Sequence, residues 1–397
     1  MRILLVHNFY GSTAPSGENE LVKAECELLK AHGHEVELFA RHSDDIRNGT
    51  IRGLAKGALC TIANPFAARK LATRIRSFNP DVVHVHNTFP LISPLAIRAA
   101  SKLAPVVLTV HNYRTQCAAG TPTRGGQICT TCLERQTVWP AVINRCYRGS
   151  LVATMPLAMN IAIYRHALLR WVSRAIVLSD FQRDRMIECG WPREKLMVKG
   201  NFVKVLGSSI GKGEKRSGCC YVGRLSNEKG VSTLIEAWRI LGANAPQLTI
   251  VGDGDARTEY EKLARGLNIR FVGKLPHEDV LVLFSLTLFI VQPSVCWETF
   301  GLTVAEAASL GTPAIVSDVG TLPEFVRGGG GRMFKVGDAS ELAESVRKML
   351  NDADWEKMSA AAVVSAKRFS PEKNYAKLID VYKAAKAEWE SHRDARN

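Results

Sequence analysis

The sequence predicts an α/β protein with two doubly wound halves, each a parallel sheet flanked by helices. Three observations lead to this fold class. The chain of 397 residues is too long for one hydrophobic core and suits two domains of ordinary size. Short apolar runs typical of strands alternate with helical stretches from the first residue onward. A second series of the same kind begins after a small, polar and flexible stretch at 205–213.

The first series predicts a domain over residues 1–204. Its apolar runs are short and of the kind that parallel sheets bury on both faces. Gly33 and Pro80 have the chemistry that ends helices, so they separate helix from strand. We expect strands at 3–7, 36–39, 82–86, 105–110 and 175–178, with helices at 20–32 and 66–78.

The second series predicts a domain over residues 205–370. We expect strands at 219–222, 248–251, 269–272, 288–291 and 314–316, separated by helices such as 232–241 and 303–310. After Ser340 the pattern is helical only. The final segment, 371–397, contains a long helix around 371–390, which we expect to pack back on the first domain.

The positive charge of the chain lies in its first half. The formal net charge is +14, and residues 1–204 carry 27 Lys and Arg against 14 Asp and Glu, whereas residues 205–397 carry 25 against 24. From Arg135 to Ser179 six arginines occur among many apolar residues without one acidic residue. Such a mixture suits an anionic membrane surface. The alternative is an ordinary solvated basic face.

The hydropathy pattern predicts a cytoplasmic protein. No apolar run reaches the roughly 18 residues that a membrane-spanning helix needs. The opening segment, Met1 to His7, turns polar too early for a secretory signal and is typical of a first strand. If the basic half binds lipid, the protein would be peripheral on the inner face of the cytoplasmic membrane.

The loops that follow strands in the second half contain the candidate ligand groups, because open parallel sheets bind ligands at the carboxyl ends of their strands. After the strand at 219–222 come Gly223, Arg224 and Leu225, with Lys229 just before a helix. Flexible backbone, a helix N-terminus and two cations can surround a diphosphate. The structural alternative is a common Gly-Arg turn with a surface lysine.

Two further strand ends carry glycines and carboxylates. Gly252, Asp253 and Gly254 follow the strand at 248–251, where a tight turn is the simpler interpretation. Glu298 lies in the loop after the strand at 288–291, and Glu306 lies in the helix that follows. This pair borders one helix N-terminus and could hold sugar and ribose hydroxyls.

At this point the chain resembles the large family 4 of retaining glycosyltransferases, which have the GT-B fold of two Rossmann-like domains. Glu298 and Glu306, with seven residues between them, match its E-x7-E signature. Four more motifs occur in the order of the family: Gly-Arg-Leu with Lys-Gly, Gly-Asp-Gly, Pro-Ser before the first glutamate, and Pro323-Glu324. The resemblance spans nearly the whole chain.

The resemblance implies a role for each donor-side residue. Arg224 and Lys229, beside Gly223 and Gly252, would bind the donor diphosphate and neutralise the charge that grows as it leaves. Glu298 would hold hydroxyls of the donor sugar, and Glu306 those of the ribose. Backbone amides of Phe300, Gly301 and Leu302 would contact the sugar. Catalysis would need no bound metal or other cofactor, because cations and helix dipoles take that role.

The same resemblance places one wall of the donor site and the acceptor in the first half. Gly17 matches a glycine of the family that lends its amide to a phosphate, although Ser16 and Asn19 depart from the family pattern around it. His111, directly after a strand, matches the active-site histidine that contacts the transferred sugar. Retention could proceed by front-face attack or through a covalent intermediate, and we favour the first because no well-placed nucleophile is evident.

Four cysteines fall within a Gly- and Arg-rich insert at 114–148. Cys117, Cys129, Cys132 and Cys146 include one C-x2-C pair, and four thiolates can close a tetrahedral zinc site. The competing interpretations are reduced buried thiols and a redox pair. A structural zinc would order this insert beside the acceptor.

The sequence therefore favours a glycosyltransferase that uses a nucleotide-diphosphate sugar and a glycan or lipid-linked glycan acceptor in surface polysaccharide synthesis. Another GT-B activity is the alternative: transfer to a soluble acceptor, epimerisation of a nucleotide sugar, or phosphorolysis. A zinc-containing nucleic-acid binder is the remote alternative, because carboxylates in a phosphate site would repel a polyanion.

Overall fold

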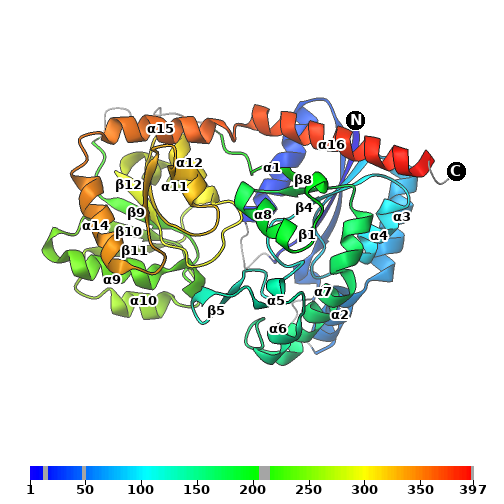
Figure 1. Ribbon diagram of the computed structural model, residues 1–397, viewed down its shortest axis with the longest axis horizontal. Coiled ribbons are helices and arrows are strands. Elements are labelled where there is room, and N and C mark those ends of the chain that lie inside the picture. Colours follow the sequence, from blue (N-terminus) through cyan, green and yellow to red (C-terminus); the bar gives the residue numbers. More distant parts are fainter. Residues whose placement is uncertain (12–16, 47–50, 205–214, 395–397) are drawn as a thin grey trace. The chain divides into compact units, whose positions relative to one another are not determined.

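The computed structural model describes residues 1–11, 17–46, 51–204 and 215–394 (Figure 1). Ser16 and the whole of the predicted linker at 205–213 lie outside these residues. The chain divides into two compact units, each with its own parallel sheet. Unit 1 comprises residues 1–122, 130–200 and 375–397, and unit 2 comprises residues 123–129 and 201–374. The prediction of two doubly wound α/β halves is confirmed.

Unit 1 is built on a six-stranded sheet in the order β2-β1-β3-β4-β7-β8, and every strand pair in it is parallel. The central strands are apolar and fully buried, as Ile3 and Val83 illustrate. The strands are β1 (Arg2–Phe9), β2 (Glu35–His42), β3 (Val82–Asn87), β4 (Val106–Thr109), β7 (Arg174–Val177) and β8 (Leu196–Val198). The strand order reverses between β1 and β3, which is where doubly wound sheets bind ligands.

Helices connect the strands of unit 1 along the chain. They are α1 (Gly17–Ala31), α2 (Ile51–Ile62), α3 (Pro65–Phe78), α4 (Leu95–Ser101), α5 (Thr131–Glu134), α6 (Trp139–Ile143), α7 (Leu151–Trp171) and α8 (Asp180–Glu188). The α7 helix is the longest of these, and Ser150 caps its N-terminus by accepting a hydrogen bond from the Ala153 amide. None of the helices in the described part of the chain is long and apolar enough to cross a membrane.

The last helix, α16 (Pro371–Asp394), groups with unit 1 from Tyr375 onward. Tyr382 is fully buried, and its hydroxyl lies 2.8 Å from Nδ1 of His84 in β3. Trp389 donates a hydrogen bond from Nε1 to the Ser101 carbonyl at 3.0 Å. The helix predicted at 371–390 thus has polar contacts with β3 and with the end of α4.

Unit 2 has a second six-stranded parallel sheet, in the order β11-β10-β9-β12-β13-β14. Its strands are β9 (Cys219–Val222), β10 (Leu248–Val251), β11 (Ile269–Gly273), β12 (Phe289–Gln292), β13 (Ala314–Ser317) and β14 (Gly331–Phe334). The strand order reverses between β9 and β12, so the loops after these two strands border the expected ligand crevice. Its helices are α9 (Val231–Leu241), α10 (Arg257–Leu263), α11 (His277–Leu286), α12 (Leu302–Ser309), α13 (Pro323–Val326), α14 (Ala339–Leu350) and α15 (Trp355–Lys367).

Besides the start of the last segment, which is Tyr375 instead of residue 371, two boundaries differ from the sequence-based expectation. The units divide between residues 200 and 201 instead of 204 and 205, and Val203 donates its amide to the Phe369 carbonyl at 3.0 Å, within unit 2. In the cysteine-containing insert, residues 123–129 group with unit 2 and the remainder with unit 1. These seven residues include a small antiparallel hairpin of β5 (Thr123–Arg124) and β6 (Gln127–Ile128). Periodicity cannot reveal such a division, because it reports only local structure.

Candidate active site

The loop after β9 holds the predicted diphosphate-binding residues against the start of α9. Leu225 is fully buried, and its amide donates to the Asp253 carbonyl at 3.0 Å, which ties this loop to the loop after β10. Gly230 has φ +68° at the N-cap of α9, and a Cβ there would lie 1.9 Å from the Pro293 carbonyl oxygen. Only glycine fits this close approach. The loops after β9 and β12 therefore pack directly on each other.

Lys229 and Glu298 form a close ion pair across these two loops. Nζ of Lys229 lies 2.6 Å from Oε1 of Glu298, and the Ser294 hydroxyl donates to the same oxygen at 2.8 Å. Both charged side chains are more than four-fifths buried. Burial by itself would lower the pKa of Lys229 and raise that of Glu298, but their mutual attraction shifts both pKa values the other way. Both groups are therefore ionised at neutral pH.

Arg224 has a different environment, although it lies only five residues from Lys229. Its side chain is 65% exposed, and Nη2 lies 3.5 Å from Oε1 of Glu228. Exposed ion pairs contribute little stability, so this guanidinium can turn toward an anion at small cost. The two predicted cations thus differ: Lys229 is held in place and Arg224 is adaptable.

The N-terminus of α12 presents unused backbone donors to the same region. Gly301 caps the helix with φ +94°, and the Phe300 side chain packs against the rings of Phe325 and Phe369. The amides of Phe300, Gly301 and Leu302 make no hydrogen bond with any other residue of the described chain. Such amides at a helix N-terminus attract anions and hydroxyl oxygens.

Glu306 lies in α12 and contacts a histidine that the sequence analysis did not predict. Its Oε1 lies 2.9 Å from Nε2 of His277, the first residue of α11. The hydrogen bond to Glu306 raises the pKa of His277. Glu298 and Glu306 therefore border the start of α12 as predicted, but each carboxylate is already engaged by a basic side chain.

In unit 1, the start of α1 explains one departure from the expected loop. Asn19 accepts a hydrogen bond from the Tyr10 amide at 3.2 Å, and its Oδ1 lies 3.1 Å from Nε2 of His7. Gly17 is the first residue of α1. The asparagine thus links the end of β1 to α1.

His111 follows β4 and contacts a second histidine. Nδ1 of His86, in β3, lies 3.0 Å from Nε2 of His111. Burial lowers the pKa of His111 well below its usual value, and the nearby His86 lowers it further. Burial also lowers the pKa of His86, to about 4. Both imidazoles are therefore neutral at physiological pH.

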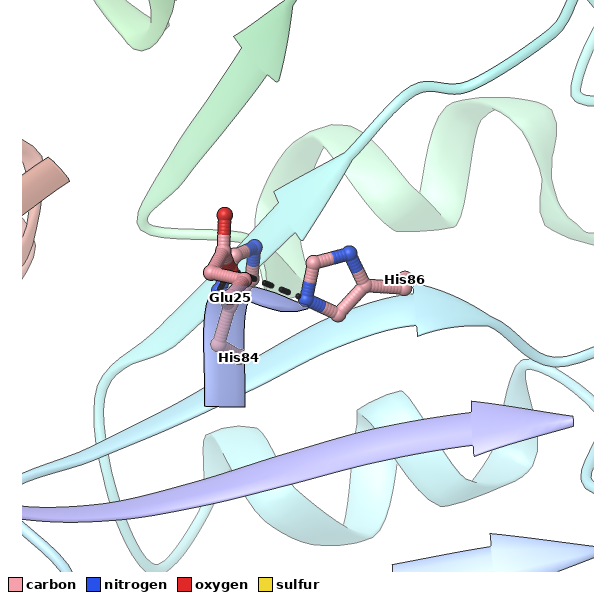
Figure 2. A group of neighbouring side chains, drawn as sticks. All are labelled: Glu25, His84 and His86. Carbon is pink, nitrogen blue, oxygen red and sulfur yellow. Dashed lines mark ion pairs between the residues drawn. The ribbon is translucent and has the colours of Figure 1, made fainter. Parts of the chain in front are cut away.

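Behind this pair lies a buried polar cluster, which Figure 2 shows. Nε2 of His86 and Nδ1 of His84 each lie 3.2 Å from Oε1 of Glu25, and Nζ of Lys199 lies 3.1 Å from the other oxygen. Burial alone would raise the pKa of Glu25, but Lys199 and the two histidines lower it well below its usual value. The carboxylate favours a proton on Nε2 of His86, so that Nδ1 accepts a hydrogen bond from Nε2–H of His111.

Glu25, His84 and His86 also have the composition of a metal site, with ligand atoms within 4.8 Å of one another. The contacts of His84, however, fit a hydrogen-bonded network better. Nδ1 of His84 lies 2.8 Å from the Tyr382 hydroxyl, and its Nε2 lies 2.7 Å from the Thr109 hydroxyl. The Lys199 ammonium on the same carboxylate would repel a divalent cation. We therefore interpret the cluster as support for His111.

Two family models together match most of the chain. The model described as "Glycosyltransferase Family 4" matches residues 16–205, and the model described as "Glycosyl transferases group 1" matches residues 207–363. The chain is a family 4 glycosyltransferase. The family's two models thus fall on the two halves of the chain that carry the two sheets.

This glycosyltransferase is similar along most of its length to named relatives. It is 28% identical to the glycogen synthase of Mycobacterium tuberculosis (strain ATCC 25618 / H37Rv), with 89% of this chain and 86% of the relative covered. It is 25% identical to the phosphatidyl-myo-inositol mannosyltransferase of Mycobacterium leprae (strain TN), with 94% of each covered. The crystal structure of Anabaena Alr3699/HepE in complex with UDP and glucose matches with a TM-score of 0.65 at 18% identity, over 97% of this chain and 100% of that one. The structural likeness confirms the GT-B fold.

Two glycines predicted to contact the donor have structural duties in this glycosyltransferase. Gly252 has φ +135°, and a Cβ there would lie 1.9 Å from the Gly223 carbonyl oxygen. Its amide donates to the Gly273 carbonyl at 2.7 Å, and the Gly223 amide donates to the Val251 carbonyl at 3.0 Å. Both amides are thus engaged by the protein, and donor contact by these glycines stays a prediction.

The zinc site predicted for four thiols stays a prediction. Burial raises the pKa of the Cys117 thiol to about 11, and the nearby Cys132 and Cys146 contribute to the rise. Within the described ranges, the group of Glu25, His84 and His86 is the one set of three or more potential ligand atoms that lie this close together. Cys129 groups with unit 2, unlike the other three. Zinc binding stays a prediction without structural support.

The histidine cluster predicts a loss of stability in mild acid. Because the pKa values of His7, His86 and His111 are lowered in the folded chain, the unfolded chain binds more protons below about pH 6.5. Each buried histidine should cost about 1.4 kcal/mol of unfolding free energy at pH 5.5 relative to pH 7.5. Replacing His86 by Gln should reduce the pH-dependent loss by about that amount, measured by urea unfolding at both pH values.

His392→Gln, on the exposed end of α16, is the matched control for this measurement. Its stability should depend on pH as that of the wild type does. An equal loss between pH 7.5 and 5.5 in His86→Gln and wild type would show that His86 is not held neutral by the fold.

Proposed function

We propose that this glycosyltransferase moves a sugar from a nucleoside-diphosphate sugar to a glycan or lipid-linked glycan, with retention of anomeric configuration. The observation that carries the proposal is the pairing of Lys229 with Glu298 beside the unused amides at the start of α12. A held cation, a carboxylate and helix amides lie together where the strand order of unit 2 reverses. This combination suits a ligand that carries both a diphosphate and hydroxyl groups.

Each donor-side group has a distinct task in this proposal. The Lys229 ammonium and the adaptable Arg224 guanidinium neutralise the diphosphate, most strongly as negative charge grows on the leaving oxygen. Glu298 accepts hydrogen bonds from sugar hydroxyls and keeps Lys229 in position. Glu306 accepts hydrogen bonds from the ribose, and His277 holds its carboxylate.

The proposed reaction is a front-face displacement. The acceptor oxygen forms a bond to the anomeric carbon while the bond from that carbon to the phosphate oxygen breaks, and the acceptor proton passes to the departing phosphate oxygen. His111 contacts the transferred sugar as a neutral imidazole, oriented by His86. The alternative is a covalent sugar–enzyme intermediate. We favour direct transfer because Glu298 is engaged by both Lys229 and Ser294.

The surface of unit 1 supports a lipid-linked acceptor. Val152, Met155, Met159 and Ile163 form one exposed apolar stripe along α7, because they are spaced three or four residues apart. Trp139 and Ile143 of the neighbouring α6 are exposed too, and exposed Arg145 and Arg148 join the two helices. We name these eight residues the α6–α7 surface.

Apolar side chains next to arginines are the pattern of proteins that lie on anionic membranes. We propose that the α6–α7 surface binds the inner face of the cytoplasmic membrane, where this enzyme would extend a surface polysaccharide such as O-antigen, capsule or exopolysaccharide. The similarity to a phosphatidyl-myo-inositol mannosyltransferase supports a lipid acceptor. The similarity to a glycogen synthase favours the second candidate, transfer to a soluble glycan.

A panel of nucleotide sugars tests the donor site through thermal stabilisation. A bound donor should raise the melting temperature of the wild type. Lys229→Ala and Glu306→Ala should weaken that donor about 10-fold or more, since each removes a charged hydrogen-bond partner. Glu298→Ala should mainly slow transfer in an assay with the same donor. Lys262→Ala, an exposed lysine of α10, is the control and should bind the donor normally.

Flotation with liposomes tests the α6–α7 surface. The wild type should float with vesicles that contain anionic phosphatidylglycerol, and high salt should reduce the bound fraction. The double variant Trp139→Ser/Val152→Ser should lose most of this binding, because it removes two of the most exposed apolar side chains. Val364→Ser, at an exposed position of unit 2, should float normally. Failure of the wild type to float at low salt would leave transfer to a soluble glycan as the better proposal.

A further inference from the structure

A pocket in unit 1 opens beside the His86–His111 pair. It encloses about 740 Å³ of empty space, part of which is open to solvent, and both histidines line it. The α7 helix contributes one wall through Leu157, Asn160, Ile161, Tyr164, Arg165 and Leu168. These residues lie on the buried side of α7, opposite the exposed stripe of the α6–α7 surface. None of the roles assigned above uses this wall.

The lining of the pocket is positively charged. Arg114 and Arg165 both line it, and no aspartate or glutamate does. The two histidines add no charge at neutral pH, because burial lowers the pKa of each. Apolar side chains, such as Ile97 and those of α7, make up much of the remaining wall. The pocket therefore offers two cations in largely apolar surroundings, where an anion would be strongly attracted.

Arg165 is buried without a counter-ion. Its side chain belongs to a residue that is only 3% exposed, and its one hydrogen bond within the described chain runs from Nη1 to Oε1 of Gln136 at 3.3 Å. Nε and Nη2 have no partner there, and no described carboxylate pairs with this guanidinium. The nearby Cys189 thiol is no substitute, because burial raises its pKa to about 11. An unpaired buried cation lowers the stability of the folded protein. Stability therefore does not explain Arg165, and a role in binding does.

Arg114 and Thr115 add further unpaired groups to the same pocket. The Arg114 guanidinium lies 4.5 Å from the centre of the Phe89 ring, and its Nε has no hydrogen-bond partner in the described part of the chain. The Thr115 hydroxyl is buried and also lacks a partner among the residues described. Four unpaired polar atoms thus come from three residues that line one pocket: Arg114 Nε, Thr115 Oγ1, Arg165 Nε and Arg165 Nη2.

We propose that this pocket binds a doubly charged, phosphate-class anion carried by the acceptor, with Arg165 and Arg114 as its ligands. Guanidinium groups recognise phosphate through paired N–H donors, and two of them balance a dianion. The apolar wall of α7 fits a phosphate attached to an apolar chain better than a free ion. The assignment to the acceptor rests on the proposed function, because it uses the position of the pocket beside His111.

Three probes separate the possible sources of the anion: inorganic pyrophosphate, farnesyl diphosphate and farnesol. Their affinities are measured by calorimetry on the full chain at constant ionic strength, in a Lys229→Ala background that weakens diphosphate binding in unit 2. Both diphosphates should bind, and farnesol should bind much more weakly. Tighter binding of farnesyl diphosphate than of pyrophosphate identifies a lipid-borne phosphate, and equal binding identifies a soluble one. Equal affinity for farnesol and farnesyl diphosphate would overturn the proposal.

Arg165→Met tests the site directly, with Arg170→Met, an exposed arginine of the same helix, as its matched control. Diphosphate affinity should fall about 10-fold or more in Arg165→Met and stay unchanged in Arg170→Met. The melting temperature of ligand-free Arg165→Met should equal or exceed that of wild type, because a buried unpaired charge is removed. A lower melting temperature with unchanged diphosphate affinity would show a purely structural arginine.

Arg165→Lys provides a second variant for this test if Arg165→Met does not fold. It retains the positive charge but loses the paired donors, so diphosphate affinity should fall between the values of Arg165→Met and wild type. If Arg165→Lys and Arg170→Met, as two single variants, both bind diphosphate with wild-type affinity, the proposal is overturned. Donor stabilisation by nucleotide sugars, measured on the same variants with Lys229 intact, reports separately on the proposed donor site. If no nucleotide sugar stabilises the wild type, the proposed function is wrong. Diphosphate binding in wild type and Arg165→Met still tests the anion pocket in that case.

Discussion

Parallel pairing of every strand in the two six-stranded sheets is the constraint on which the candidate site depends. Parallel strands bring all their carboxyl ends to one edge, so that loops distant in sequence must meet there. In unit 2 this brings Lys229 and Glu298 within 2.6 Å, although 69 residues separate them. In unit 1 it sets His86 against His111 in the same way. The packing of glycines such as Gly230 then determines how closely these loops approach.

The sequence predicted the parts of the site that lie at strand ends. Lys229, Glu298 and Glu306 could be found because each follows a recognisable strand and belongs to a motif with fixed spacing. The strand pattern also identified two doubly wound halves, since buried parallel strands are short, apolar and separated by helices. The fold and the donor residues were therefore accessible from local patterns and their order along the chain.

The partners of these residues were not accessible in that way. His277 contacts Glu306, and Glu25 supports His86, through side chains that start on separate helices and strands and carry no common motif. Arg165 illustrates the same limit: in the sequence it is one arginine among six, and only its burial distinguishes it. Burial and pairing over long sequence separations are tertiary properties.

The carboxyl-terminal helix has a consequence for the order of synthesis. Tyr382 contacts His84, and His84 adjoins the Glu25 cluster behind His111, so residues near position 380 complete a polar core made by the first 200. A ribosome releases those first residues long before α16 emerges. Unit 1 therefore lacks Tyr382, and so part of its buried core, until residues 201–374 of unit 2 have been synthesised. The folding of the two units is coupled in time, because unit 1 is made from segments that are synthesised before and after most of unit 2.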